Sequence, residues 1–202
     1  MAAPITPNAV LREMSDKVNM PFGQRESPLG VMEFLIEKAA PGDYETLAFV
    51  IREVWLQMEQ KEWFAADDSE TICRILEEGR GLGYKAFEKE SGALAGVFLG
   101  VLPGNGEENL GRDIGLAGEE LEKVAHMDTI AILPQYRGNG LQHTMMQAAE
   151  EELKNQGYKY LMCTIHPENI YSKKNAVMQG YKVVLTKEKY GGYVRDILLK
   201  RL

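Results

Sequence analysis

The most constraining feature of the sequence is an apolar run that leads through a glycine-bearing loop into a helical pattern. Residues 124–133 have the composition of a strand, Pro134 ends it, and the loop that follows carries Gly138 and Gly140. Helical periodicity then continues to Gln156. The first turn of such a helix leaves backbone N–H groups unpaired and carries a partial positive charge. The segment therefore predicts an α/β fold and a binding place for a phosphate or pyrophosphate, with an ordinary strand-to-helix turn as the alternative.

Strand-like and helix-like segments alternate along the rest of the chain. Apolar residues at helical spacing follow Asp43, a plausible N-cap, and a near-continuous apolar run at 158–165 is typical of a strand covered on both faces. The order β α α β β β α β α β β predicts an α/β sandwich of helices on a mixed sheet. The expected elements span residues 32–39, 43–58, 68–79, 83–88, 93–102, 124–133, 138–156, 158–165, 168–179, 181–187 and 193–200.

The composition argues against several classes of partner. The chain has 202 residues, with 23 Lys+Arg against 30 Asp+Glu and a net charge of −7, whereas nucleic-acid binding depends on clustered Lys and Arg. The apolar run at 95–102 is shorter than the ~20 residues of a membrane span, and residues 1–30 lack an apolar signal segment. Two cysteines and three histidines do not make a metal cluster in any recognised spacing. We therefore expect a cytoplasmic protein with no nucleic-acid, membrane or metal partner.

The hexapeptide QYRGNG at residues 135–140 resembles the Q/R-x-x-G-x-G/A signature of the GNAT family, the acyl-CoA-dependent N-acyltransferases. Downstream, Asn169 lies eleven residues before Gly180, a separation that is typical of the same family. The order of elements is also similar to the family's mixed, mostly antiparallel central sheet flanked by helices. The resemblance implies a single GNAT-like acyltransferase domain over residues 31–202, with residues 1–30 as an N-terminal extension.

The resemblance implies an N-acetyltransferase with acetyl-CoA as co-substrate. The strand that holds Ile130 and Ile132 is expected to splay from the next strand, so that its open edge pairs with the amide groups of pantetheine. Asn169 and Ser172 stand where the family contacts the pantetheine arm, and helix capping is the alternative for both. Six successive backbone amides are implied to hold the pyrophosphate, namely those of Arg137, Gly138, Asn139, Gly140, Leu141 and Gln142.

Acyl transfer to an amine needs a base, a donor to the oxyanion and a leaving thiolate. Family members that use a side-chain base often place it four or six residues before the Ile132 position, which implies Asp128 and His126 as catalytic residues. Strand alternation puts both on one face, and histidine accepts a proton readily at neutral pH. Asp128 is the base, a group that orients His126, or the group that holds the substrate ammonium; a polar pair at a strand end is the alternative. The N–H of Ile132 is implied as the oxyanion donor.

The sequence departs from the family at the leaving group. Many members have a tyrosine seven residues after the asparagine that protonates the thiolate, but the residue seven after Asn169 is Ala176. A thiol with a pKa near 8.5 is already a fair leaving group, so turnover does not require this acid. Because of this departure, a non-catalytic module that binds acyl-CoA is one alternative function. An α/β interaction domain that binds no cofactor is the other. An acyl-enzyme at Cys163 is a minor one.

Acidic residues near the expected acceptor side favour a cationic amine. Segment 58–68 joins the first two helices, where GNAT proteins shape the acceptor site, and its Trp63 and Phe64 either wall a pocket or cover a turn. The glycine-rich, acidic segment 104–122 is either functional or mobile, or a solvated insertion. The expected acceptor is a primary amine of a small molecule or peptide, and the protein is expected to be a monomer or homodimer.

Overall fold

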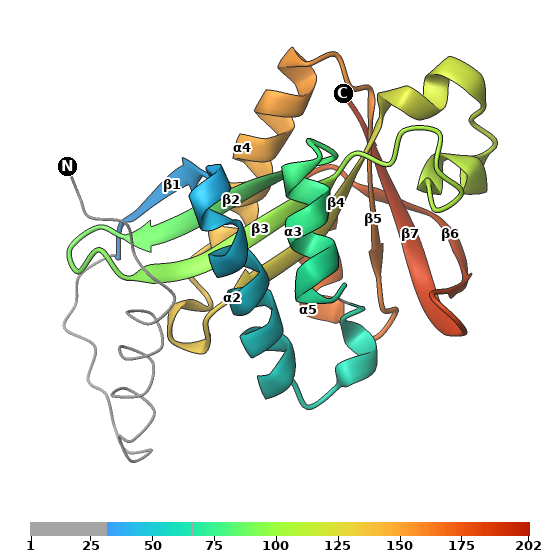
Figure 1. Cartoon of the computed structure of the whole chain (residues 1–202). Coiled ribbons are helices and arrows are strands. Elements are labelled where there is room, and N and C mark those ends of the chain that lie inside the picture. The colour runs from blue at the N-terminus through green and yellow to red at the C-terminus, as the bar shows by residue number, and fades with distance from the viewer. Residues whose placement is uncertain (1–31, 66) are drawn as a thin grey trace.

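A computed structural model describes residues 32–65 and 67–202, and the extension expected over residues 1–30 lies outside them (Figure 1). Within this part of the chain, the predicted order of strands and helices is confirmed. The helices are α2 (Tyr44–Gln57), α3 (Ser69–Glu77), α4 (Leu141–Asn155) and α5 (Ile170–Met178). The strands are β1 (Phe34–Lys38), β2 (Gly81–Glu88), β3 (Leu94–Val101), β4 (Val124–Ile132), β5 (Tyr160–Ile165), β6 (Lys182–Lys189) and β7 (Tyr193–Arg201).

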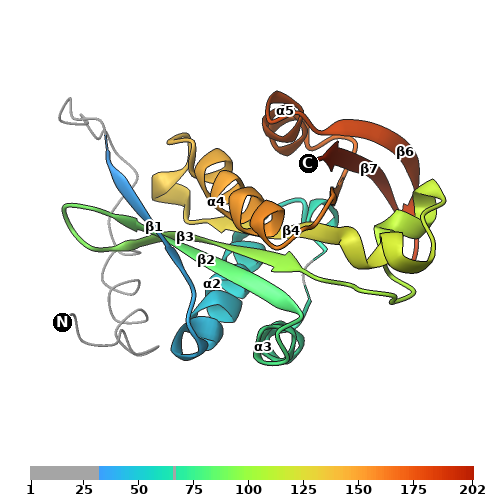
Figure 2. The ribbon, with the colours of Figure 1, turned by 90° about the horizontal axis from the view of Figure 1, so that it is seen from above.

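These strands form one sheet in the order β1-β2-β3-β4-β5-β7-β6. Only β4 and β5 are parallel, and the other neighbours are antiparallel, which confirms the mixed, mostly antiparallel sheet. Figure 2 shows α4 and α5 on one side of the sheet and α2 and α3 on the other. The main core fills both interfaces, with Leu47 of α2, Phe98 of β3 and Met145 of α4 all buried in it.

Two helix starts show how local sequence sets the boundaries. Asp68 caps α3, because its Oδ1 accepts the N–H of Thr71 at 2.8 Å. Helix α4 begins at Leu141, three residues later than the periodicity predicts. The reason is that Gly138 (φ 84°) and Gly140 (φ 73°) have left-handed backbone conformations, which a right-handed helix cannot include.

Segment 104–122 folds against the sheet. It forms two 3₁₀ turns, Leu110–Ile114 and Gly118–Lys123, and Leu110 packs into a second apolar cluster with residues of β4, β5 and β7. Asp113 forms ion pairs with Lys187 and Lys189 of β6, at 2.7 and 2.9 Å. The interpretation as a solvated insertion is therefore wrong for the part from Leu110 onward, because this part connects the middle of the sheet to its β6 edge.

Candidate active site

Strands β4 and β5 separate along their length and leave an opening between them. Their parallel pairing ends at His126 and Met162, although β4 continues to Ile132 and β5 to Ile165. Figure 1 shows β4 and β5 diverging. The splay that the resemblance implies is therefore present.

The open edge of β4 presents backbone amides to this space. The N–H of Leu133 donates to the carbonyl of Ala95, in β3, at 3.0 Å. Because successive N–H groups of a strand point to opposite sides, the N–H groups of Ile132 and Ile130 point away from β3 and into the opening. A ligand with amide groups of its own is the natural partner of such an edge.

The loop between β4 and α4 forms a cradle of unpaired amides at the helix N-terminus. The N–H groups of residues 138–142 donate no hydrogen bond to the described residues, 32–65 and 67–202. The N–H of Arg137, predicted as a sixth donor, is used instead by the carbonyl of Pro134 at 3.3 Å. A Cβ added at Gly138 or Gly140 would meet nothing within 4 Å, so both glycines face open space. Five amides and the helix dipole therefore fit a pyrophosphate.

Side chains of the same loop hold the cradle in shape. The Nδ2 of Asn139 donates to the carbonyl of Tyr136 at 3.0 Å, and the Nε of Arg137 donates to the carbonyl of Ile132 at 3.3 Å. These bonds tie the loop to itself and to the end of β4. The amides are therefore arranged before any ligand binds, which lowers the entropic cost of binding.

Asn169 and Ser172 lie at the start of α5. Helix capping, the alternative to ligand binding, accounts for one of their hydrogen bonds. The Oδ1 of Asn169 accepts the N–H of Ser172 at 3.1 Å. The side-chain N–H groups of Asn169 donate to none of residues 32–65 and 67–202, and so remain for a ligand. Ala176 is buried on the same helix, so the structure offers no hydroxyl at the position of the family's tyrosine.

His126 is placed where it supports the fold. Its side chain is 7% exposed, and its Nε2 accepts the backbone N–H of Leu110 at 3.1 Å. A general base needs a free acceptor nitrogen, and this bond occupies the one at His126. Burial, followed by the charge of Lys189, lowers the pKa of His126 to about 4. The structure therefore favours a structural role for His126 over the catalytic role expected from its spacing.

The pKa of His126 has a consequence for stability. The unfolded chain binds a proton at this position below about pH 6.5, but the folded protein does so only near pH 4, so the contribution to stability is lost as the pH falls through this window. We expect His126 to lower the free energy of unfolding by about 3 kcal/mol between pH 7.5 and pH 4. Urea unfolding across this range measures the loss, and the His126→Gln variant should lose correspondingly less. An equal loss in the two proteins would contradict a buried, neutral histidine.

Asp128 has a different environment, because a β-bulge interrupts the alternation that placed it beside His126. Leu99 and Gly100 of β3 pair with Thr129 and Met127, so Asp128 has no partner on β3. Its side chain is exposed, and its Oδ2 accepts the hydroxyl of Thr129 at 2.9 Å. Protein nevertheless surrounds the carboxyl closely enough that desolvation, followed by the charge of Asp67, raises the pKa of Asp128 to about 6. This carboxylate is accessible to a substrate and accepts protons near neutral pH.

Three other parts of the chain meet beside β5, namely segment 58–65, β7 and the turn between β6 and β7, and no sequence pattern predicted this meeting. The Nη2 of Arg195 on β7 donates to the carbonyl of Glu62 at 2.6 Å. The Trp63 ring stacks on His166, with centroids 6.2 Å apart, whereas Phe64 packs against the main core. The turn between β6 and β7 adds Tyr190, whose hydroxyl lies 3.1 Å from that of Thr164 on β5. Segment 58–65 is thereby held beside β5 and β7, although neither contact follows from spacing along the chain.

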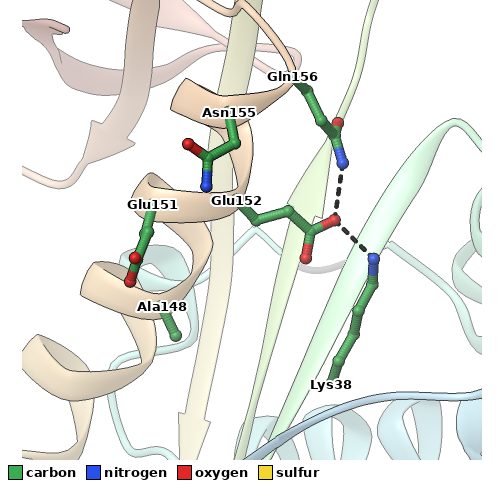
Figure 3. Close-up of a pocket in the computed structure, with 6 residues that line it drawn as sticks. All are labelled: Lys38, Ala148, Glu151, Glu152, Asn155 and Gln156. Carbon is green, nitrogen blue, oxygen red and sulfur yellow. Dashed lines mark hydrogen bonds and ion pairs between the residues drawn. The ribbon is translucent and has the colours of Figure 1, made fainter.

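Another pocket lies at the opposite end of α4, between this helix and β1 (Figure 3). Lys38 and Glu152 form an ion pair there at 2.6 Å, and Gln156 donates to the same carboxylate at 2.8 Å. The negative end of the α4 dipole and the carboxylates of Glu151 and Glu152 disfavour an anion at this place. The pocket is therefore a poor match for a pyrophosphate-bearing ligand.

Two negative findings concern the described part of the chain. Over residues 32–65 and 67–202, no three His, Cys, Asp or Glu side chains are grouped so that they could bind a metal ion. In the same residues, no helix has the length and apolar character that crossing a membrane requires.

The sequence profile of the acetyltransferase (GNAT) family matches residues 36–181, which run from within β1 to just beyond α5 and therefore include both the cradle and the opening. The chain belongs to the GNAT family. This membership confirms the expectation of an acetyltransferase with acetyl-CoA as co-substrate. No curated protein matches the chain in sequence.

Solved structures agree on the GNAT fold at low sequence identity. The GNAT-family acetyltransferase from Streptococcus pneumoniae is 19% identical and covers 84% of this chain and 100% of its own, with a TM-score of 0.61. Arabidopsis thaliana NAA60, solved in complex with acetyl-CoA, is 12% identical and covers 84% of this chain and 99% of its own, with a TM-score of 0.66. The ribosomal-protein-S18-alanine N-acetyltransferase from Escherichia coli is 13% identical and covers 84% of this chain and 94% of its own, with a TM-score of 0.60.

Proposed function

We propose that this GNAT acetyltransferase moves the acetyl group of acetyl-CoA directly to a primary amine of a small molecule or peptide, in the opening between β4 and β5. The observation that carries the proposal is the position of Asp128, an accessible carboxylate at the narrow end of this opening. The amides of residues 138–142 would hold the pyrophosphate, and the β4 edge at Ile130 and Ile132 would hold the pantetheine arm. Asn169 and Ser172 would contact the pantetheine arm and the residues around it.

The backbone amides also support a role in the chemistry. Bound acetyl-CoA supplies the acyl group and the thiolate leaving group. The N–H of Ile130 would donate to the thioester oxygen as negative charge develops on it, because Ile132, implied for this role by the resemblance, lies about 13 Å along β4 from Asp128. One such donor is worth on the order of 3 kcal/mol of transition-state stabilisation in other acyl-transfer enzymes.

Asp128 would act as the general base. An alkyl ammonium has a pKa of about 10, so the acceptor loses one proton to solvent before its nitrogen attacks, and the nitrogen must lose a second proton as the N–C bond forms. A carboxylate with a pKa raised toward neutral holds that proton better than an ordinary aspartate. His126 is not needed for this step, because its acceptor nitrogen is already bonded.

Direct transfer is favoured over an acyl-enzyme. Cys163 is buried on β5, and desolvation, followed by the charge of Asp128, raises the pKa of its thiol to about 12. A thiol of this pKa forms almost no thiolate at neutral pH and is a poor nucleophile.

The acceptor is proposed to carry more than one positive charge. Asp67, just before α3, is close enough to raise the pKa of Asp128, and burial and the Asp68 charge raise the pKa of Asp67 itself. A second cationic group on the acceptor would relieve this crowding of negative charge. By contrast, Asp113 in segment 104–122 is already paired with two lysines.

We expect Asp67→Asn to raise the KM for a diamine about threefold while changing the KM for a monoamine little, because an exposed ion pair is worth at most about 1 kcal/mol. Steady-state kinetics with 1,4-diaminobutane and butylamine measures this, and the difference should shrink at high salt. Glu70→Gln, in the first turn of α3, is the matched control and should change neither KM. An unchanged diamine KM in Asp67→Asn would contradict the charge argument.

The proposed function is tested by amine-dependent release of the CoA thiol, measured with a panel of polyamines, aminoglycosides, amino acids and peptides. Turnover with at least one cationic amine supports the proposal. Binding of CoA without turnover on any amine would instead support a non-catalytic acyl-CoA-binding module.

A further inference from the structure

The side chain of Tyr190 reaches from the β6–β7 turn toward the opening. Its φ of 52° makes it the one non-glycine residue with a positive φ among residues 32–65 and 67–202. This conformation costs on the order of 1 kcal/mol, so the surrounding structure must hold the residue in place. One restraint is the hydrogen bond between the hydroxyls of Tyr190 and Thr164, which are 3.1 Å apart.

The register of the sheet puts this pair of hydroxyls level with Asp128. His126 pairs with Met162 in parallel register, and Asp128 and Thr164 each lie two residues further along their strands. Both residues therefore stand just beyond the point where β4 and β5 part. The Tyr190 hydroxyl, bonded to Thr164, is fixed at the narrow end of the opening with Asp128 on the neighbouring strand.

The hydroxyl of Tyr190 is also in the right protonation state to act as an acid. Burial is the main cause that raises the pKa of its phenol, and the Asp128 carboxylate adds to the effect. The phenol therefore keeps its proton at neutral pH, although the side chain is 48% exposed and open to a ligand.

Other tyrosines are committed or distant. The hydroxyl of Tyr181 donates to Glu150 at 2.8 Å, that of Tyr84 to Glu152 at 2.6 Å, and that of Tyr160 to Glu120 at 2.8 Å. Tyr171, at the start of α5, is 75% exposed. Of these hydroxyls, only that of Tyr190 is bonded to a residue in the splayed part of β5.

We propose that the Tyr190 hydroxyl donates a proton to the sulfur of the departing CoA, which is the task that a tyrosine at the position of Ala176 would perform. This inference rests on the proposed function. The acceptor enters as the neutral amine after its ammonium has lost one proton to solvent. As the N–C bond forms, Asp128 takes a proton from nitrogen; as the C–S bond breaks, Tyr190 gives its proton to sulfur. Asp128 then returns its proton to the Tyr190 phenolate, and both residues recover their starting states.

A binding measurement tests the contact between Tyr190 and sulfur without catalysis. Isothermal titration at pH 8 compares CoA with desulfo-CoA, which lacks the sulfur. We expect wild-type protein to bind CoA about fivefold more tightly, as one hydrogen bond of about 1 kcal/mol implies. The preference should disappear in Tyr190→Phe and persist in the matched control Tyr193→Phe, on the other side of the same turn. An undiminished preference in Tyr190→Phe would overturn the inference.

Steady-state kinetics distinguishes a Tyr190 that acts as a general acid from a Tyr190 that only binds the acceptor. Tyr190→Phe is expected to lower kcat by up to about 100-fold, with both KM values within about twofold of wild type. Thr164→Val, which keeps the tyrosine but removes its partner, should give a smaller loss in kcat. A raised acceptor KM with unchanged kcat would overturn the inference and make Tyr190 an acceptor-binding residue. Failure of wild-type protein to bind CoA at all would instead overturn the proposed function.

Discussion

Asp128→Asn is expected to lower kcat on the order of 100- to 1,000-fold while leaving the affinity for CoA nearly unchanged. The substitution preserves the shape of the side chain but removes the group that accepts a proton from the amine. Because the Asp128 carboxylate is hydrogen-bonded to Thr129 of its own strand and not to the loop, we expect the cradle at residues 138–142 to be undisturbed. Steady-state kinetics and titration with CoA measure the two effects separately.

The pH profile provides a sharper form of the same test. The pKa of Asp128 is raised to about 6, and the base must be ionised to act, so kcat/KM of wild type, calculated from the concentration of neutral amine, should fall tenfold per pH unit below about pH 6. The residual activity of Asp128→Asn should lack this acidic limb. The variant removes a desolvated charge, so its urea midpoint at pH 7 should not be lower than that of wild type. An acidic limb that persists unchanged in Asp128→Asn would contradict the assignment of the base.

Gly140→Val is expected to weaken CoA binding on the order of 100-fold. Gly140 has a φ of 73°, and a β-branched residue disfavours this conformation strongly, so the backbone that aims the amides would shift. Its side chain would also project into the open space in front of the cradle. Losing two charge-assisted hydrogen bonds of about 1.5 kcal/mol each accounts for an effect of this size.

Gly79→Val is the matched control for the cradle. Gly79 follows α3, has a φ of 68° and also faces open space, so valine there meets a similar backbone penalty far from the loop that precedes α4. Both variants should lose similar stability in urea unfolding, but only Gly140→Val should lose CoA affinity. Equal CoA affinity in the two variants would contradict the role of the residue 138–142 amides.

The features that the sequence predicts correctly are local ones. The unpaired amides follow from a strand, two glycines and a helix within about twenty residues, so short-range pattern is enough to find them. The element order follows from periodicity in the same way. The late start of α4 at Leu141 and the loss of the Arg137 donor depend on backbone angles that composition does not specify.

The features that sequence analysis missed depend on long-range contacts. His126 and Asp128 look equivalent in a strand, but a bulge and the packing of Leu110 give them opposite environments. Tyr190 reaches Thr164 only because β7 pairs between β5 and β6, which brings a distant turn to the opening. No spacing rule links residues that meet through the order of strands in a sheet.

The most direct measurement is a crystal structure of the protein grown with excess CoA. We predict diphosphate oxygens within hydrogen-bonding distance of the residue 138–142 amides, and pantetheine amides paired with the β4 edge at Ile130 and Ile132. The sulfur should then lie at the narrow end of the opening, beside Asp128. CoA bound elsewhere, or an opening that the protein's own side chains fill while CoA is present, would contradict this arrangement.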